Sequence, residues 1–334
     1  MKKYRKRSDL SLRDNLKYKT ILVTGGACFL GSHLVDALIL KKVKKIIIID
    51  NLFNGNLENL AHAKNSKKLK IFIEDAAKYS VLEKIFFKYK IDIVFNCATK
   101  ALNYSFINPK DAFLVNTNII INLLEIQRKK LFKTLCHFST SEVYGSAKYK
   151  PMDELHPTYP STTYAAGKLS ADKAIQSYVA MFDLDAFIVR PFNNYGPRQN
   201  IKNYLSGVIP STVKKILSNS KPEIHGDGNQ SRDFIYVEDT ISAVLKLYDV
   251  LKRGEDVNIS ATNEITIKNL VTKICKLMNY KGKVIKKPNR VADVKSHNSS
   301  NKKMKKLINF KITPFDTALK KTLDWYKFSF NTIK

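Results

Sequence analysis

The sequence predicts an α/β fold: a doubly wound parallel sheet covered by helices on both faces, followed by a smaller C-terminal α/β domain. Short, continuous apolar runs alternate with helical patterns from about residue 18 to about residue 190. The first run passes through Gly25 and Gly26 directly into a helical pattern, as in a nucleotide-binding strand–turn–helix unit. After Pro191 the expected elements become shorter, which indicates a second, smaller unit.

Each expected strand of the sheet is apolar along its whole length, because a central parallel strand is buried on both faces. The six strands are expected at residues 20–23, 45–50, 69–73, 91–97, 135–139 and 186–189. Helical spacing of apolar residues continues from the glycine turn to Leu40, and longer helices are expected at 111–129, 164–181 and 267–278. The boundary near residue 190 is soft, since chains of this kind often cross back between the two parts.

The composition excludes several protein classes. The 334 residues are 44% hydrophobic and 26% charged, which is ordinary for a folded, water-soluble chain. No apolar stretch is long enough to span a membrane, and the basic first 19 residues lack the apolar centre of a secretory signal. The four cysteines are scattered and form no C-x-x-C pair, so we expect a cytoplasmic protein without a disulfide framework or a metal site.

The net charge of +29 raises the possibility of nucleic-acid binding. Lysines recur along most of the chain instead of gathering on one element, so we interpret the charge as a solvated basic surface, without specific nucleic-acid recognition. Such a surface still favours phosphate-bearing substrates. A non-catalytic NAD- or RNA-binding protein that kept the fold is the remote alternative.

The glycine turn at residues 24–31 is expected to bind a pyrophosphate. Backbone N–H groups at the start of a helix, together with the helix dipole, form an anion site. Glycine at position 25 permits a tight turn, and Gly31 permits close packing of helix on strand. Cys28 occupies a position where glycine is usual, and its side chain adds atoms at the phosphate site. Asp50 ends the second strand, where a carboxylate accepts hydrogen bonds from an adenosine ribose and favours NAD over NADP.

A catalytic group is expected where the strand at 135–139 ends in Thr140, Ser141 and Glu142. Tyr164 and Lys168 are four residues apart on an expected helix and therefore share a face. An ammonium beside a phenol favours the phenolate, so we expect a lowered pKa for Tyr164 and a usable base at neutral pH.

These motifs together resemble a known family: the extended short-chain dehydrogenase/reductases that act on nucleotide sugars, the NAD-dependent epimerase/dehydratase group. The resemblance extends from residue 19 to residue 330. Its motifs are TGGACFLGSHL, IIIIDNLFNG, FSTSEVYG, Tyr164 with Lys168, RPFNNYGPRQN, SRDFIYVEDT and the late RVADV.

The resemblance implies a Rossmann-like NAD-binding domain at residues 19–190 and a nucleotide-sugar-binding domain at 191–334. It implies that Tyr164 takes the proton of the sugar 4-hydroxyl and that Lys168 holds the nicotinamide ribose. Thr140 would bond the sugar hydroxyl, and Asn116 resembles a structural asparagine of the active site. The expected NAD-binding set is Gly25, Cys28, Phe29, Leu30, Gly31, Asp50, Asn51, Asp75, Ala76, Tyr164 and Lys168. The residues expected to bind the substrate's diphosphate and nucleotide are Asn193, Arg198, Arg232 and Arg290.

The reaction is left among three alternatives that share a 4-keto intermediate. A 4,6-dehydratase must remove the C5 proton and expel the C6 hydroxyl, and Glu142 with Ser141 suits that task. A UDP-glucuronate decarboxylase would also carry the Thr-Ser-Glu sequence, but the arginine that such enzymes have after the late R-x-x-D segment is replaced here by the run at His297. A 4-epimerase needs no carboxylate beside the threonine. The dehydratase is therefore preferred, although sugar dehydratases often have histidine at the position of Ala101 and aspartate at that of Ser141.

Residues 1–18 form a basic extension for which disorder is expected.

The helix expected at 111–129 is unusually apolar. It carries more apolar surface than one sheet face requires, namely Ile119, Ile120, Ile121, Leu123, Leu124 and Ile126. Since helices of this type pair in the resembled family, a homodimer is expected.

Overall fold

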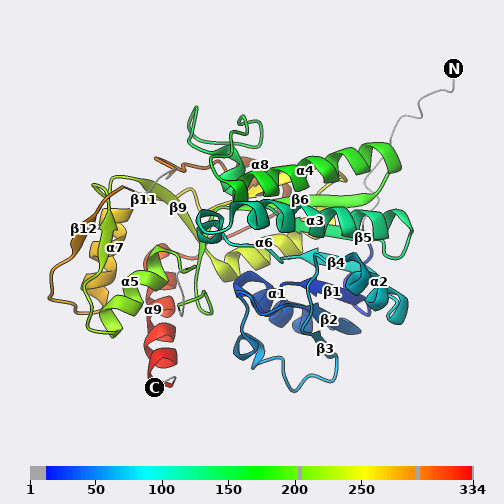
Figure 1. Ribbon diagram of the computed structural model, residues 1–334, viewed down its shortest axis with the longest axis horizontal. Helices are drawn as coiled ribbons and strands as arrows, with labels where there is room; N and C mark the ends of the chain where they lie inside the picture. The colour runs from blue at the N-terminus through cyan, green and yellow to red at the C-terminus, as the bar shows by residue number, and fades with distance from the viewer. Residues whose placement is uncertain (1–12, 202–204, 290–293, 333–334) are drawn as a thin grey trace.

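A seven-stranded parallel sheet forms the centre of the molecule (Figure 1), in the order β10-β6-β5-β4-β1-β2-β3. The structure is a computed structural model, and it describes residues 13–201, 205–289 and 294–332. The predicted doubly wound sheet is confirmed. Its strands are β1 (Thr20–Thr24), β2 (Lys45–Ile49), β3 (Leu69–Phe72), β4 (Ile93–Asn96), β5 (Thr134–Phe138), β6 (Asp185–Pro191) and β10 (Asp256–Ile259).

Two helical layers cover the sheet, and the strands supply side chains to both. In β1, Ile21 and Val23 belong to the core beneath α1 and α6, whereas Leu22 faces α2, α3 and α4 on the other side. All three side chains are fully buried, which is why the sequence here is apolar at every position. The covering helices are α1 (Phe29–Leu40) and α6 (Val237–Val250) on one face and α2 (Tyr79–Lys88), α3 (Pro109–Arg128) and α4 (Thr163–Phe182) on the other.

The C-terminal part builds a smaller lobe from short strands and helices (Figure 1). A three-stranded sheet has the order β11-β9-β7, and a second sheet pairs β12 with β8. These strands are β7 (Asn193–Tyr195), β8 (Glu223–His225), β9 (Ser231–Tyr236), β11 (Glu264–Thr266) and β12 (Ile285–Lys287). The helices are α5 (Val208–Leu217), α7 (Ile267–Leu277), α8 (Lys302–Leu307) and α9 (Phe315–Thr332), and short 3-10 helices occur at η1 (Leu57–Leu60), η2 (Leu102–Phe106) and η3 (Ser141–Tyr144).

The chain does not leave the large sheet for good at residue 191. After β9 it returns through α6 and adds β10 to the edge of the sheet, parallel to β6. The carboxyl ends of the central strands therefore face β7 and β9, which come from the smaller lobe. This arrangement places both parts of the chain around one site.

The expectation of disorder for residues 1–18 is wrong for the described part of that segment. The Arg13 side chain is 6% exposed, donates hydrogen bonds to Asp185 and to the carbonyls of Tyr248 and Leu251, and lies 4.3 Å over the Phe187 ring. A guanidinium so far removed from water requires such partners, and β6, α6 and the residue after α6 supply them here. Residues 1–12 lie outside the described residues. Within the described chain, no helix combines the length and apolar character that crossing a membrane requires.

Candidate active site

A cavity of about 400 Å³ opens between the carboxyl end of the sheet and the smaller lobe. One wall carries Thr140, Ser141, Glu142 and Tyr164 from the large domain. The opposite wall comes from β7, β8, β9, α5 and the loops beside them, and includes Asn193 and Arg232. Four of the five predicted catalytic residues, all but Lys168, and two of the predicted substrate-binding residues therefore line one cavity.

The threonine–serine–glutamate segment is held by local hydrogen bonds at the end of β5. The Thr140 hydroxyl caps η3 by accepting a hydrogen bond from the Glu142 backbone N–H, at 3.2 Å. Gly145 ends η3 with φ of 66°, and a Cβ there would lie 2.1 Å from the Tyr159 carbonyl, so glycine is required. Both ends of the segment are thus fixed, and its side chains face the cavity.

Tyr164 lies in the first turn of α4, two residues after the capping residue Thr162, whose side chain accepts from the Ala165 N–H. Its hydroxyl forms hydrogen bonds with Thr140 and Thr99. Burial raises the pKa of Tyr164 to about 12, and the two threonine hydrogen bonds act in the opposite direction. The predicted lowering of the Tyr164 pKa is therefore not found, because burial outweighs these two hydrogen bonds.

The Tyr164 pKa is not lowered because the Lys168 ammonium is directed elsewhere. Its side chain is 2% exposed, and Nζ donates a hydrogen bond to the Phe138 carbonyl at 2.8 Å. Burial lowers the pKa of Lys168 to about 8, and Asp172, one turn further along α4, partly offsets this. Spacing placed the ammonium and the phenol on one helical face, but the ammonium is directed to the strand end instead of the phenol oxygen.

No other residue fits at two glycine positions in the segment that joins β1 to α1. Gly25 has φ of 68°, and an added Cβ would lie 2.7 Å from the Ala98 backbone. At Gly31 an added Cβ would lie 2.1 Å from the Gly25 carbonyl. Phe29, Leu30 and Gly31 form the first turn of α1, where backbone N–H groups have no partner within the helix. The start of α1 thus has the unpaired N–H groups that the predicted anion site requires.

Cys28 does not distort this turn. As the residue preceding α1 it has φ of −78° and ψ of 178°, an extended conformation that needs no glycine. Its Sγ is directed to the Asp50 carboxylate, 3.6 Å from Oδ2. The thiol therefore packs beside the carboxylate that ends β2.

A smaller cavity continues from the turn along the ends of β2, β3 and β4. It is lined by Gly25, Cys28, Asp50, Asn51, Asp75 and Ala76, all from the predicted NAD-binding set. Asp50 is 4% exposed and accepts hydrogen bonds from the backbone N–H groups of Ala27 and Leu52, both at 2.9 Å. Oδ2 also meets the Cys28 thiol, so these contacts orient Asp50 and leave the second acceptor position of Oδ1. A glycine cradle, a helix start and acidic strand ends together fit an adenine dinucleotide.

The structure separates the four residues predicted to bind the substrate. Asn193 and Arg232 line the main cavity. Arg198 does not line it: its guanidinium pairs with Asp36 of α1 at 2.7 Å, and its backbone has a φ of 68°. Its predicted contact with the substrate stays a prediction. Arg290 lies outside the described residues.

Several cavity residues were missed by the sequence analysis. Thr99 follows β4 at the carboxyl edge and bonds both Tyr164 and the Asn116 amide oxygen, the latter at 2.9 Å. Its place at a strand end is a signal that could have found it. Asn116 also accepts from the Lys100 N–H at 2.9 Å, so it holds the loop after β4, as the resemblance implies for a structural asparagine. His225 and Gln230 line the far end of the cavity, where no local sequence pattern singles them out.

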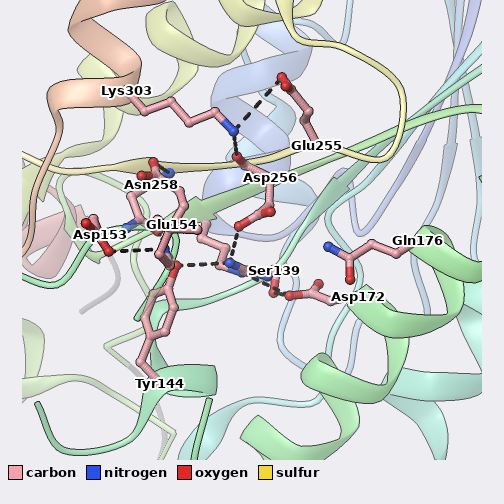
Figure 2. Close-up of polar contacts among 12 residues, drawn as sticks. Ser139, Tyr144, Asp153, Glu154, Asp172, Gln176, Glu255, Asp256, Asn258 and Lys303 are labelled. Carbon is pink, nitrogen blue, oxygen red and sulfur yellow. Dashed lines mark hydrogen bonds and ion pairs between the residues drawn. The ribbon is translucent and has the colours of Figure 1, made fainter. Parts of the chain in front are cut away.

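A buried polar network lies directly behind the catalytic segment (Figure 2). Asp172, Tyr144 and Asp256 surround the guanidinium of Arg190, and the Ser139 hydroxyl donates to Asp172 at 2.9 Å. The network joins β5, β6, β10, η3 and α4, the elements that carry or support the catalytic side chains.

Comparisons with known proteins identify the family of the chain. The model of the "NAD dependent epimerase/dehydratase family" matches residues 21–260, most of the chain. The chain belongs to this family. The resemblance carried by the sequence motifs is thereby confirmed, and the seven-stranded sheet is the one that solved members contain.

Individual members of the family point to two activities. The chain is 36% identical to a putative UDP-glucose 4-epimerase of Methanocaldococcus jannaschii, over 79% of this chain and 84% of that protein. It is 30% identical to human dTDP-D-glucose 4,6-dehydratase, over 95% of this chain and 92% of that protein.

Among solved structures, UDP-glucose 4-epimerase of Thermotoga maritima with UDP-glucose superposes with a TM-score of 0.87, at 27% identity, over 93% of this chain and 99% of that one. The dTDP-glucose 4,6-dehydratase of Bacillus anthracis in complex with NAD gives a TM-score of 0.84, at 28% identity, over 94% and 98%.

Proposed function

We propose that this protein is an NAD-dependent 4,6-dehydratase of a nucleoside-diphosphate sugar. The observation that carries the proposal is the position of Glu142 in the cavity wall, two residues from Thr140 and on the same wall as Tyr164. A carboxyl group beside the phenol supplies the second acid–base group that elimination requires and that simple epimerisation at C4 does not. Named 4,6-dehydratases among the relatives support the same activity.

NAD, when bound along the glycine turn, supplies the acceptor and later the donor of one hydride. Tyr164 accepts the proton of the sugar 4-hydroxyl, and the hydrogen bonds from Thr140 and Thr99 favour its phenolate form. Thr140 also lies where it can orient the same hydroxyl. Lys168 lies behind these residues as a buried ammonium at neutral pH.

Glu142 and Ser141, on the same wall, act at C5 and C6 of the sugar. A 4-keto group makes the C5 proton acidic, and Glu142 removes it. Ser141, buried beside it in η3, assists protonation of the departing C6 hydroxyl. At the far wall, Arg232 provides the cation that suits the diphosphate, with Asn193 beside it.

The test is incubation of the purified protein with a panel of nucleoside-diphosphate sugars, followed by product mass. Loss of one water identifies dehydration, loss of carbon dioxide identifies decarboxylation, and unchanged mass with altered retention identifies epimerisation. Dehydration of at least one sugar in the panel is expected. A chain that consumes none of them contradicts the proposal.

Glu142→Gln is expected to stop the reaction after C4 oxidation, with turnover reduced by a factor on the order of 10² or more. Reduced cofactor should still form on the enzyme, because Tyr164 and the glycine turn are untouched. Tyr164→Phe is the matched variant, since it should prevent C4 oxidation itself. Full activity of Glu142→Gln would contradict the dehydratase and favour a 4-epimerase.

The 4-epimerase is the second candidate because a putative UDP-glucose 4-epimerase has 36% identity to the chain. The two candidates differ in solvent exchange at C5. A dehydratase must break the C5–H bond and an epimerase leaves it intact, so incorporation of deuterium at C5 in heavy water distinguishes them.

We also propose a homodimer, on the resemblance alone. The apolar side chains of the helix at 111–129 no longer argue for it, because Ile119, Ile120, Leu123, Leu124 and Ile126 are buried within the chain against the sheet. Exposed apolar side chains remain on α3 and α4 at Leu114, Met181 and Phe182. Light scattering at micromolar concentration should give twice the mass of the chain, and a monodisperse monomer would contradict the dimer.

A further inference from the structure

His297 is a buried histidine that faces a catalytic carboxyl group. Its side chain is fully buried, and its Nδ1 lies 3.8 Å from Oε1 of Glu142. Nδ1 has no hydrogen-bond partner. A buried histidine that served only packing would normally have both ring nitrogens satisfied. One ring nitrogen is thus directed toward the active-site glutamate.

The surroundings fix the ring and its tautomer. The backbone N–H of His297 donates to the Ser231 carbonyl at 3.2 Å, and the ring meets Phe192 edge-on at 6.0 Å between centroids. Nε2 lies 3.2 Å from the Gly145 carbonyl. Since a carbonyl oxygen only accepts hydrogen bonds, Nε2 must carry the proton. In the neutral ring, Nδ1 therefore presents a lone pair to Glu142.

The charges around the pair favour a neutral ring. Burial lowers the pKa of His297 to about 3, and Arg232 of β9 and, to a smaller extent, His156 act in the same direction. The hydrogen bond to the Gly145 carbonyl and the more weakly acting Glu264 of β11 oppose this shift without cancelling it. On the α4 side, Tyr164 faces Glu142. At neutral pH the histidine is thus an acceptor that faces a carboxyl oxygen.

We propose that His297 is a positioning residue for Glu142 in the dehydration step, which rests on the function proposed above. When the C5–H bond breaks, its electron pair passes into the enolate of the 4-ketone and its proton passes to a carboxylate oxygen of Glu142. A small rotation of Glu142 then lets the new O–H donate to Nδ1 of His297. The histidine stabilises the protonated glutamic acid, orients it toward C5 and makes its carboxylate a stronger base.

Two substitutions distinguish the roles of the two ring nitrogens of His297. His297→Gln places an amide N–H near Nε2, so the bond to Gly145 is kept and the acceptor toward Glu142 is lost. His297→Asn places an amide oxygen near Nδ1, so an acceptor is kept and the Gly145 bond is lost. For each variant the rate of deuterium incorporation at C5 is divided by the rate of C4 oxidation, which normalises for the folded fraction.

The ratio is expected to fall about tenfold in His297→Gln and to stay within about threefold of the wild-type ratio in His297→Asn, with KM unchanged in both. Because an acceptor facing a carboxyl group favours its protonated form, the rising limb of the pH profile should move about one unit lower in His297→Gln. An unchanged ratio, an unchanged profile, or a shift to higher pH would overturn the inference. If the wild-type protein itself exchanges no C5 proton, the proposed dehydration fails instead.

Discussion

At the scale of single residues, burial decides the chemistry of the site more than sequence spacing does. Tyr164 and Lys168 are four residues apart, as a base and its cation should be, yet the ammonium bonds the Phe138 carbonyl and the phenol bonds two threonines. Burial disfavours the charged form of each group: the pKa of Lys168 falls to about 8 and that of Tyr164 rises to about 12.

The lowered Lys168 pKa predicts a pH-dependent stability. Between pH 8 and the ordinary lysine pKa of 10.5, the unfolded chain binds more protons at this position than the folded chain, so stability rises with pH across that window. Relative to Lys168→Met, the wild-type free energy of unfolding should gain about 3 kcal/mol between pH 7 and about pH 10.5. Urea denaturation of both proteins at the two pH values measures the difference, in which the other lysines cancel. A constant difference would show that the ammonium is not desolvated.

At the scale of elements, the Arg190 network keeps the catalytic segment in register with the sheet. Arg190 of β6 bonds Asp172 of α4 at 3.0 Å and Tyr144 of η3 at 2.9 Å, and it pairs with Asp256 of β10. Arg190 is 3% exposed and Asp172 is fully buried, so neither charge has an alternative partner in water. Four elements distant in sequence are thus connected through one guanidinium.

Arg190→Leu is expected to destabilise the fold by about 3–5 kcal/mol, because it leaves two carboxylates without their buried counter-ion. Denaturant unfolding measures this loss. The control is Arg253→Leu, which removes an arginine that is 39% exposed and pairs with the exposed Asp183. That change should cost no more than about 1 kcal/mol. Equal losses in the two variants would contradict a special role for the network.

At the scale of the whole molecule, the return of the chain to the large sheet creates the site. β6 leads into β7 of the smaller lobe, and α6 and β10 then lead back, so the cavity lies between strand ends of the large sheet and residues of β7 to β9. The chain that forms this cavity carries a net charge of +29. Such a charge concentrates anionic substrates near the surface, and salt screens the effect.

The KM for a nucleoside-diphosphate sugar should therefore rise several-fold between about 50 mM and about 500 mM salt, while kcat stays within about twofold, since screening acts on encounter and not on the buried catalytic groups. Steady-state kinetics in sodium chloride and in choline chloride of equal ionic strength measure this. A KM independent of both salts would show that the surface charge plays no part in substrate capture.

The order of strands along the chain, the glycine turn and the catalytic segment could all be predicted from the sequence, because each depends on residues close together in the chain. Apolar runs predict buried parallel strands, and the ends of β1, β2 and β5 carry the expected Gly25, Asp50 and Thr140. The family follows from the same short motifs. Such features are set by backbone geometry and local hydrogen bonds.

Only the tertiary structure decided which distant groups meet. It turned Arg198 to Asp36, brought Arg13 into the core beside Asp185, and placed His297 against Glu142. It also buried Ile119, Ile120, Leu123, Leu124 and Ile126 of α3 within the chain. These pairs join residues far apart in the chain, 162 positions for Arg198 and Asp36 and 172 for Arg13 and Asp185. Pairing at such separations is fixed by desolvation and packing in the folded chain, which no local pattern encodes.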